Sequence, residues 1–408
     1  MTDLSRLIIP RGFRFGAIKA GVKASGRTDF SLIVADTPAS AAAAFTANRV
    51  IAAPLIVDKQ HLTASKGKVR VVAINAGNAN CAAGQAGLDA ANATCDAAAR
   101  IFACRAEEVF PSSTGVIGVP LPADKLIDVM PTLAASLGAE SDRFLEVAHA
   151  ILTTDTVEKT AFARIEVAGP DGAPQEIRIA ALGKGSGMIH PQLVPHATML
   201  IYILTDAAVE PAVLDSYLRP AIEVSFNRIS VDGDTSTNDT VLLLASGASG
   251  VSIGPANPAF ASALTQVCTS MARQVVADGE GLTHVVELRI EGAANDADAL
   301  RVAKAIAHSP LVKTAWAGND PNWGRLAAAI GYSGVQVDPD RFDISFGALP
   351  ICRNGGRAPE FDEDTAHAYV SQKEFSISIH LHQGEGSCVF WTTDLTHEYI
   401  HINADYST

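Results

Sequence analysis

The sequence lacks the cysteine patterns that mark metal-binding and disulfide-rich proteins. Its 408 residues include six cysteines, and no two of them form a C-x-x-C pair. Scattered cysteines of this kind argue against a zinc site and against a disulfide framework. We therefore expect no metal, and free thiols in a reducing cytoplasm. The six are Cys81, Cys95, Cys104, Cys268, Cys352 and Cys388.

Positive charge is also scarce. Lysine and arginine together number 31, against 44 aspartate and glutamate residues, which gives a formal net charge of −13. Nucleic-acid binding calls for a basic patch, so this balance argues against a nucleic-acid partner. No apolar run reaches the roughly 20 residues of a membrane span. The start of the chain, Met1-Thr2-Asp3-Leu4, lacks the basic flank and apolar core of a signal peptide. We expect a cytoplasmic location and no membrane partner.

The chain does have an ordinary globular composition, with 48% hydrophobic and 18% charged residues. Apolar runs at 68–75 and 240–245 predict buried strands, and apolar residues at helical spacing in 211–226 and 259–277 predict helices. This mixture predicts an α/β (α+β layered) fold with mixed sheets and outer helices. We interpret the alanine-rich residues 39–44 as a helix or a tightly packed core segment.

The glycine-rich segment 183–189 (GKGSGMI) and the pair Ala197-Thr198 that follows it point most clearly to chemistry. A phosphate-binding loop needs Ser or Thr after its lysine, whereas Gly185 follows Lys184, so an NTPase is excluded. Thr198 opens an apolar run, and threonine there is by itself typical of a strand. If the bond before it breaks, however, its hydroxyl can attack while its own α-amine acts as the base.

Two polar loops are candidates for the rest of a site. The backbone amides and hydroxyls of Ser112-Ser113-Thr114-Gly115 can stabilise a developing oxyanion, although such loops also occur without a function. Residues 231–239 (VDGDTSTND) lack the spaced carboxylates and closing glutamate of a calcium loop. We expect this segment to form either an active-site wall or a simple turn.

Together these segments resemble one family, the ornithine acetyltransferases (glutamate N-acetyltransferases) of arginine biosynthesis. The resemblance spans nearly the whole chain and is carried by nine motifs in family order. One departure from the family pattern is a loop between Ile189 and Thr198 that is three residues longer. The motifs lie at 75–80, 112–118, 153–156, 184–189, 197–200, 205–207, 232–239, 320–325 and 399–408.

The resemblance implies an N-terminal-nucleophile-like acyltransferase fold and a precursor that cleaves itself between Ala197 and Thr198. An α chain of residues 1–197 and a β chain of residues 198–408 would stay together and assemble as an α2β2 heterotetramer. Thr198 would be the nucleophile, and Thr114 and Gly115 would form the oxyanion site. Substrate contacts would fall on Thr153 or its neighbour Thr154, and on Lys184, Thr198, Glu280, Asn403 and Thr408.

The activity implied by the resemblance is transfer of an acetyl group from N2-acetylornithine to glutamate through an acetyl-threonine enzyme. Lys184 suits a substrate carboxylate, and Glu280 suits the free amine of ornithine. These small molecules would be its partners, and no cofactor is required. Use of acetyl-CoA as a co-substrate stays open, because the sequence has no readable CoA signature. Two other hypotheses are an N-terminal-nucleophile amidohydrolase or aminopeptidase that uses water, and a non-catalytic binding protein.

Overall fold

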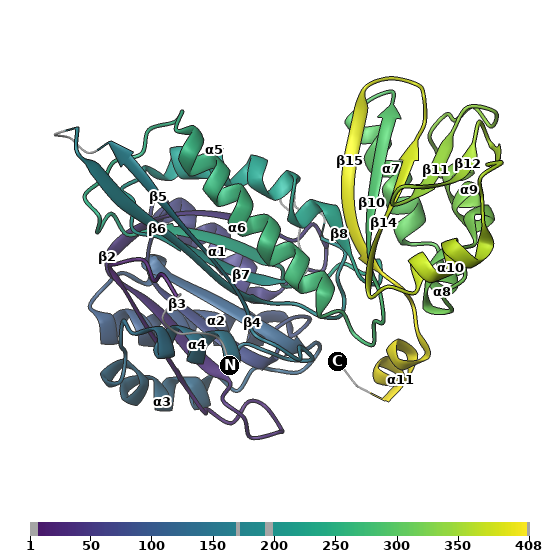
Figure 1. The fold of residues 1–408 in the computed structure, drawn as a ribbon. Coiled ribbons are helices and arrows are strands. Elements are labelled where there is room, and N and C mark those ends of the chain that lie inside the picture. Colours follow the sequence, from purple (N-terminus) through teal and green to yellow (C-terminus); the bar gives the residue numbers. More distant parts are fainter. Residues whose placement is uncertain (1–6, 169–171, 192–198, 406–408) are drawn as a thin grey trace.

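The computed structural model describes residues 7–168, 172–191 and 199–405. These residues form two bodies, each built on one mixed β-sheet with helices packed against it (Figure 1). The predicted class, an α/β layered fold with mixed sheets and outer helices, is therefore confirmed.

The sheet of the first body has the strand order β4-β3-β2-β9-β7-β6-β5, and β1 pairs with β2 outside this path. The pairs β3–β4 and β7–β9 are parallel, and the other pairs are antiparallel. The strands are β1 (Phe13–Ile18), β2 (Phe30–Phe45), β3 (Lys68–Asn78), β4 (Val109–Val116), β5 (Lys159–Ala168), β6 (Pro174–Lys184), β7 (Leu200–Thr205) and β9 (Thr240–Ala245).

Helices cover both faces of this sheet (Figure 1). One face carries α5 (Pro211–Glu223) and α6 (Pro258–Ala277). Of the remaining helices, α4 (Ser141–Ala150) packs with Phe13 and Phe15 of β1, whereas α2 (Gly84–Phe102) and α3 (Ala123–Ala135) pack in a separate cluster with Phe30 and Leu32 of β2. Helix α1 (Ala53–Ala64) contributes side chains to both clusters. Short 3-10 turns, η2 (Ala106–Glu108) and η3 (Phe226–Arg228), lead into the neighbouring strands.

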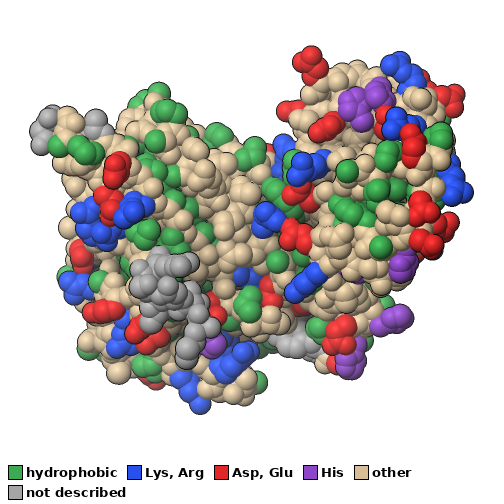
Figure 2. Space-filling view, in the orientation of Figure 1, with side chains coloured by type: hydrophobic (Ala, Val, Ile, Leu, Met, Phe, Trp, Pro, Cys, Tyr) green, Lys and Arg blue, Asp and Glu red, His purple; other side chains and the backbone are tan. Residues whose placement is uncertain are grey.

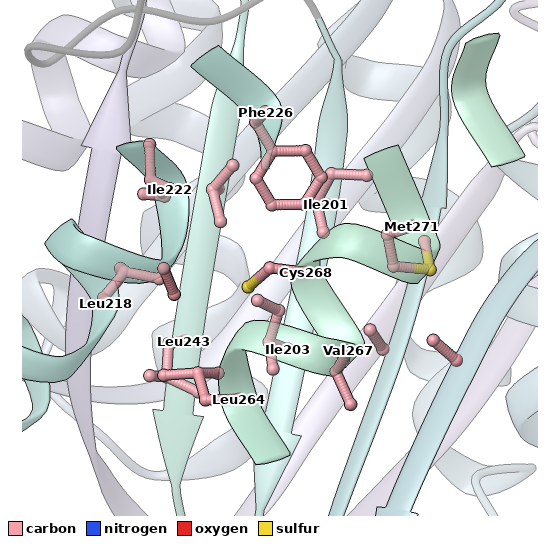
Figure 3. Close-up of a cluster of buried hydrophobic side chains, with 14 of the residues drawn as sticks. Ile201, Ile203, Leu218, Ile222, Phe226, Leu243, Leu264, Val267, Cys268 and Met271 are labelled. Atoms are coloured by element: carbon pink, nitrogen blue, oxygen red, sulfur yellow. The ribbon is translucent and has the colours of Figure 1, made fainter. Parts of the chain in front are cut away.

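Burial on both faces of the sheet explains why the sequence of β7 is an unbroken apolar run. Ile201 and Ile203 point to the face covered by α5 and α6, where they pack among Leu218, Leu264 and other apolar side chains (Figure 3). Tyr202 and Leu204, one residue out of phase, are buried in the core on the opposite face. A strand buried on both faces has no polar side, so alternation is lost.

The second body is built on a sheet with the order β13-β12-β11-β14-β10-β15-β8. Its strands are β8 (Ile229–Ser230), β10 (Val285–Ala293), β11 (Asp343–Phe346), β12 (Leu349–Arg353), β13 (Gly356–Arg357), β14 (Glu374–His380) and β15 (Gly386–Thr393). It also holds α7 (Asp296–Ala307), α8 (Pro310–Ala317), α9 (Trp323–Gly331) and α10 (Glu363–Val370). The last helix, α11 (His397–Asp405), leaves this body and lies near the end of the chain, below it in Figure 1.

The two bodies share part of one hydrophobic core. Val285 of β10 and Trp391 of β15 pack in the same buried cluster as α5 and α6. Because α6 belongs to this shared core, the segment that follows its end is held at the junction between the bodies.

The alanine-rich residues 39–44 lie inside β2, so the helical interpretation was wrong. This part of β2 pairs with β9 from Ser40 to Phe45, and its small side chains let helices pack closely on the strand. Packing against neighbours thus outweighs the helical preference of alanine. The alternative interpretation, a tightly packed core segment, is confirmed.

The first sheet contains strands from both sides of the expected cleavage point. Strand β6 ends at Lys184, β7 begins at Leu200, and residues 179–184 of β6 pair with the whole of β7. Ala197 and Thr198 themselves lie outside the described residues. The division into chains 1–197 and 198–408 stays a prediction, and under it the two chains would share one sheet.

Within the described ranges, none of the helices has the length and apolar character needed to cross a bilayer. On the face seen in Figure 2, acidic and basic side chains are interspersed.

Candidate active site

A cavity lies where the ends of several strands of the first sheet meet the last helix, α11. Its walls come from segments far apart in the sequence: the end of β4, the end of β6, the start of β7, residues 232–239 and α11. Seven of the ten predicted site residues line it, namely Thr114, Gly115, Thr153, Thr154, Lys184, Glu280 and Asn403. The other three, Ala197, Thr198 and Thr408, lie outside the described residues, although Met199, next to Thr198, also lines the cavity.

Gly115 occupies a position where only glycine fits. Its φ of +133° is in the region that side chains disfavour, and a Cβ there would lie 2.3 Å from the carbonyl carbon of Gly77. The backbone of β4 thus presses directly against β3 at the cavity. Thr114 lies beside it and is almost fully buried. Such a fixed backbone is what an oxyanion site requires.

Buried asparagines hold this backbone in place. The Ser113 hydroxyl donates to Asn75 Oδ1 at 2.6 Å, and Asn75 Nδ2 donates to the Asn78 carbonyl at 2.8 Å. From the opposite side, Asn238 Nδ2 donates to the carbonyls of Ala79 and Ser113, at 2.6 and 2.9 Å. Two of the resembling motifs, at 75–80 and 232–239, therefore support the predicted oxyanion segment.

Lys184 reaches the cavity from the last position of β6. Its ammonium lies 3.7 Å from Asp155 Oδ2, a distance that suits an ion pair but exceeds a hydrogen bond. An ammonium has three donors, so Lys184 can still bind a ligand carboxylate. Its side chain is 10% exposed, which favours a strong interaction with an incoming anion.

Glu280 also lines the cavity and follows just after α6. Its carboxylate rests on the glycine loop, because a Cβ on Gly187 would lie 2.4 Å from its Cδ. Asn403 Nδ2 of α11 donates to Glu280 Oε2 at 2.9 Å. The second carboxylate oxygen and the cavity position leave Glu280 suited to bind an ammonium or amine.

Asp232 and Tyr399 were not predicted as site residues, yet both line the cavity. Asp232 accepts the backbone N–H groups of Met188 and Ile189 at 2.7 and 2.8 Å, and the Tyr399 hydroxyl at 3.3 Å. It therefore ties the glycine loop to α11. Burial raises the pKa of Asp232, although these backbone hydrogen bonds oppose the rise. Burial, together with Asp232 and Glu280, raises the pKa of Tyr399 far above its usual range, so its hydroxyl stays a donor.

Only part of this arrangement could be recognised from the sequence. Asp232 lies in the polar segment 231–239, for which we expect either an active-site wall or a simple turn, and this segment lines the cavity. Tyr399 lies in the last resembling motif, but a single aromatic residue in a charged helix has no distinguishing pattern.

Within the described parts of the chain, no group of three or more histidine, cysteine, aspartate or glutamate side chains is placed to hold a metal ion. The six cysteines are all free, and five of them are buried.

Comparison with known proteins shows the family to which this chain belongs. The profile of the ArgJ family matches residues 14–408. This chain belongs to the ArgJ family. A relative from Geobacter sulfurreducens named "Arginine biosynthesis bifunctional protein ArgJ" is 44% identical over 402 residues, covering 98% of this chain and 99% of the relative. A relative of the same name from Chlorobaculum tepidum is 43% identical, covering 97% of this chain and 96% of the relative.

Among solved structures, the arginine biosynthesis bifunctional protein from Bacillus halodurans is 42% identical, with a TM-score of 0.48. The match covers 49% of this chain and 96% of that chain. The resemblance to ornithine acetyltransferases of arginine biosynthesis, drawn from nine motifs, is thus confirmed at the level of the ArgJ family. The roles of individual residues in the cavity stay predictions.

Proposed function

We propose that this protein transfers an acetyl group from N2-acetylornithine to glutamate in arginine biosynthesis. The observation that carries the proposal is the meeting of Thr114, Gly115, Lys184, Glu280 and Asn403 around one cavity beside Met199. They come from distant parts of the sequence, so their meeting is a property of the fold. Membership in the ArgJ family and the biosynthetic name of the relatives favour transfer to an amino acid over hydrolysis by water or simple binding.

The reaction has two steps at Thr198. Its hydroxyl oxygen attacks the acetyl carbonyl carbon of N2-acetylornithine, and its own α-amine takes the hydroxyl proton. Thr114 and Gly115 stabilise the oxyanion. The C–N bond then breaks, the α-amine returns the proton to the departing nitrogen, and ornithine leaves an acetyl-threonine ester. The glutamate amine attacks that ester, its C–O bond breaks, and N-acetylglutamate departs as the threonine hydroxyl is restored.

Lys184 and Glu280 orient both substrates, which share an α-carboxylate and an α-nitrogen. Lys184 binds the α-carboxylate, and Glu280, held by Asn403, faces the free side-chain amine of N2-acetylornithine. Contacts from Thr153 or Thr154 and from Thr408 would complete the site, as the resemblance implies.

The remaining parts of the proposal concern cleavage, cosubstrate, assembly and location. We propose self-cleavage between Ala197 and Thr198, which frees the α-amine, and an α2β2 assembly of the two products. The word "bifunctional" in the names of the relatives supports a second activity, which we propose to be acetylation of glutamate by acetyl-CoA. No cofactor or metal takes part in either reaction. Six free cysteines support a location in the reducing cytoplasm.

Replacement of the nucleophile tests the proposal. Wild-type protein should run on a denaturing gel as two chains, each near half of the 42.5 kDa total, and should convert N2-acetylornithine and glutamate to ornithine and N-acetylglutamate. Thr198→Ala should run as one chain and lose transfer, because it has neither the hydroxyl nor the free α-amine. Thr314→Ala, an exposed threonine of α8, is the control and should behave as wild type. Wild-type transfer rates in an uncleaved Thr198→Ala variant would contradict the mechanism.

A further inference from the structure

Next to Lys184 lies a buried group of charges that the proposed chemistry does not use, formed by Asp155, Lys159 and Asp278. Lys159 is fully buried, and its Nζ donates to Asp155 Oδ1 at 2.8 Å and to Asp278 Oδ2 at 2.6 Å. Asp155 also faces Lys184. Two lysines and two aspartates thus balance in charge, which is the condition under which buried charges are tolerated.

Asp155 holds one part of the cavity wall. Its Oδ1 accepts the Gly185 N–H at 2.6 Å, and its Oδ2 accepts the Thr153 N–H at 3.1 Å. Burial alone would raise the pKa of Asp155, but the ammonium groups of Lys184 and Lys159 and the Gly185 hydrogen bond outweigh it and lower the pKa. The carboxylate is therefore ionised, and it joins the segment of Thr153 to the loop of Lys184.

Asp278 holds the other part of the wall. Its carboxylate accepts the N–H of Thr156 at 3.0 Å and also its hydroxyl, and its carbonyl accepts the Ser186 hydroxyl at 2.6 Å. Two residues further on, the Glu280 N–H donates to the Ser186 carbonyl at 3.3 Å. Glu280 is thereby fixed against the loop that carries Lys184.

Lys159 connects the two parts, because it pairs with both carboxylates. Asp155 and Lys159 precede the proposed cleavage point, whereas Asp278 follows it, so this ion pair would join the two products. We propose that Asp155 and Lys159 are positioning residues, which hold Thr153 and Lys184 in register with Glu280 through Asp278. They set the binding of the amino-acid part of the substrate without touching the reacting acetyl group. This inference rests on the proposed function.

Two acetyl donors separate positioning from chemistry. N2-acetylornithine needs the whole wall, whereas 4-nitrophenyl acetate offers an activated acetyl group that needs only the nucleophile and the oxyanion site. Asp155→Asn should lower kcat/KM for N2-acetylornithine about tenfold to a hundredfold, because small misplacements of binding groups are that costly. The burst of 4-nitrophenolate from the ester, and self-cleavage on a gel, should stay close to wild type.

A matched control is Asp206→Asn. Asp206 is equally buried and forms an ion pair with Arg11 at 2.7 Å, but it follows β7 at the end opposite the cavity. This variant should lose stability, but its kcat/KM for N2-acetylornithine and its burst with 4-nitrophenyl acetate should change by the same factor. If Asp155→Asn does not fold, Thr156→Val serves instead, because it removes one hydroxyl that donates to Asp278. It should lower kcat/KM for N2-acetylornithine by about threefold to tenfold relative to the burst with 4-nitrophenyl acetate.

An equal fall with both donors would overturn the positioning role, and so would an unchanged kcat/KM for N2-acetylornithine. A wild-type protein that gives a nitrophenolate burst but no transfer from N2-acetylornithine to glutamate would instead defeat the proposed function. The two failures are therefore distinguishable.

Discussion

Single residues in this site matter through the space they leave as much as through the groups they carry. At Gly115 the absence of a side chain lets β4 touch β3, and at Gly187 it lets the Glu280 carboxylate rest on the loop. Neither requirement is visible in the sequence, where 32 glycines occur. A glycine's neighbours, which decide whether it is replaceable, come from other parts of the chain.

Gly115→Ala should lower acetyl transfer by about two to three orders of magnitude, the typical cost of losing an oxyanion donor. The added Cβ would lie 2.3 Å from Gly77, so the backbone that holds the oxyanion site must move. Steady-state kinetics with N2-acetylornithine measures the loss.

The control for this prediction is Gly118→Ala in the same motif. Gly118 also has a positive φ, +82°, but a Cβ there meets no atom within 4 Å. It should cost about 1 kcal/mol of stability through backbone strain and leave most of the activity. Similar kinetics in the two variants would show that backbone displacement at Gly115 is not what matters.

Whole elements could be predicted where burial leaves a pattern in the sequence. The apolar run of β9, residues 240–245, was predicted with its exact limits, because both faces of a central strand are buried. The hydrophobic spacing at 259–277 likewise matches α6. Residues 39–44 could not be assigned from the sequence alone, because alanine occurs in both helices and strands. Pairing with β9 makes this segment a strand.

The candidate site, too, could be predicted from the sequence only in part. Motif resemblance identified Thr114, Lys184, Glu280 and Asn403, and all four line the cavity. The buried pair Lys159–Asp278 left no signal, because its partners are 119 residues apart and each reads as an ordinary surface charge. Only the fold reveals that these charges are buried.

Helix α6 should be the element whose packing matters most to stability, because its core reaches both bodies. Leu264→Ala should destabilise the protein by about 2–5 kcal/mol, the range for a buried leucine that leaves a cavity. Thermal unfolding followed by circular dichroism should show a lower Tm. Leu311→Ala, at a leucine of α8 that is 63% exposed, should change the Tm little. Equal changes in the two variants would contradict the importance of α6.

At the scale of the whole molecule, the junction between the bodies contains a buried lysine. Lys313 of α8 donates to the Thr393 carbonyl of β15, and the Thr393 hydroxyl donates to the Val231 carbonyl at 3.4 Å. Burial lowers the pKa of Lys313 to about 8, although Asp394 and Asp232 oppose this. The charged form is therefore less favourable in the folded protein than in the unfolded chain.

The consequence is a pH dependence of stability in the alkaline range. An unfolded lysine titrates near 10.4, so between pH 8 and 10 the unfolded state binds more protons and the folded state gains stability as pH rises. The gain from Lys313 is at most about 3 kcal/mol. Urea unfolding of wild type and Lys313→Met at pH 7, 8, 9 and 10 should show a stability difference that grows with pH in favour of wild type. The exposed Lys373→Met is the control, and a difference for Lys313→Met that stays constant with pH would contradict the prediction.

Strand β7 lies between β6 and β9, so one sheet contains strands from before and after the expected cleavage point. If the chain is cut before Thr198, folding becomes an event that each molecule completes only once. The precursor folds as a single chain, at a rate independent of concentration. After unfolding, the two products would have to find each other in solution, and recovery would depend on how concentrated they are. An unfolded molecule would then be replaced by new synthesis, because refolding would require the slow association of two separate chains.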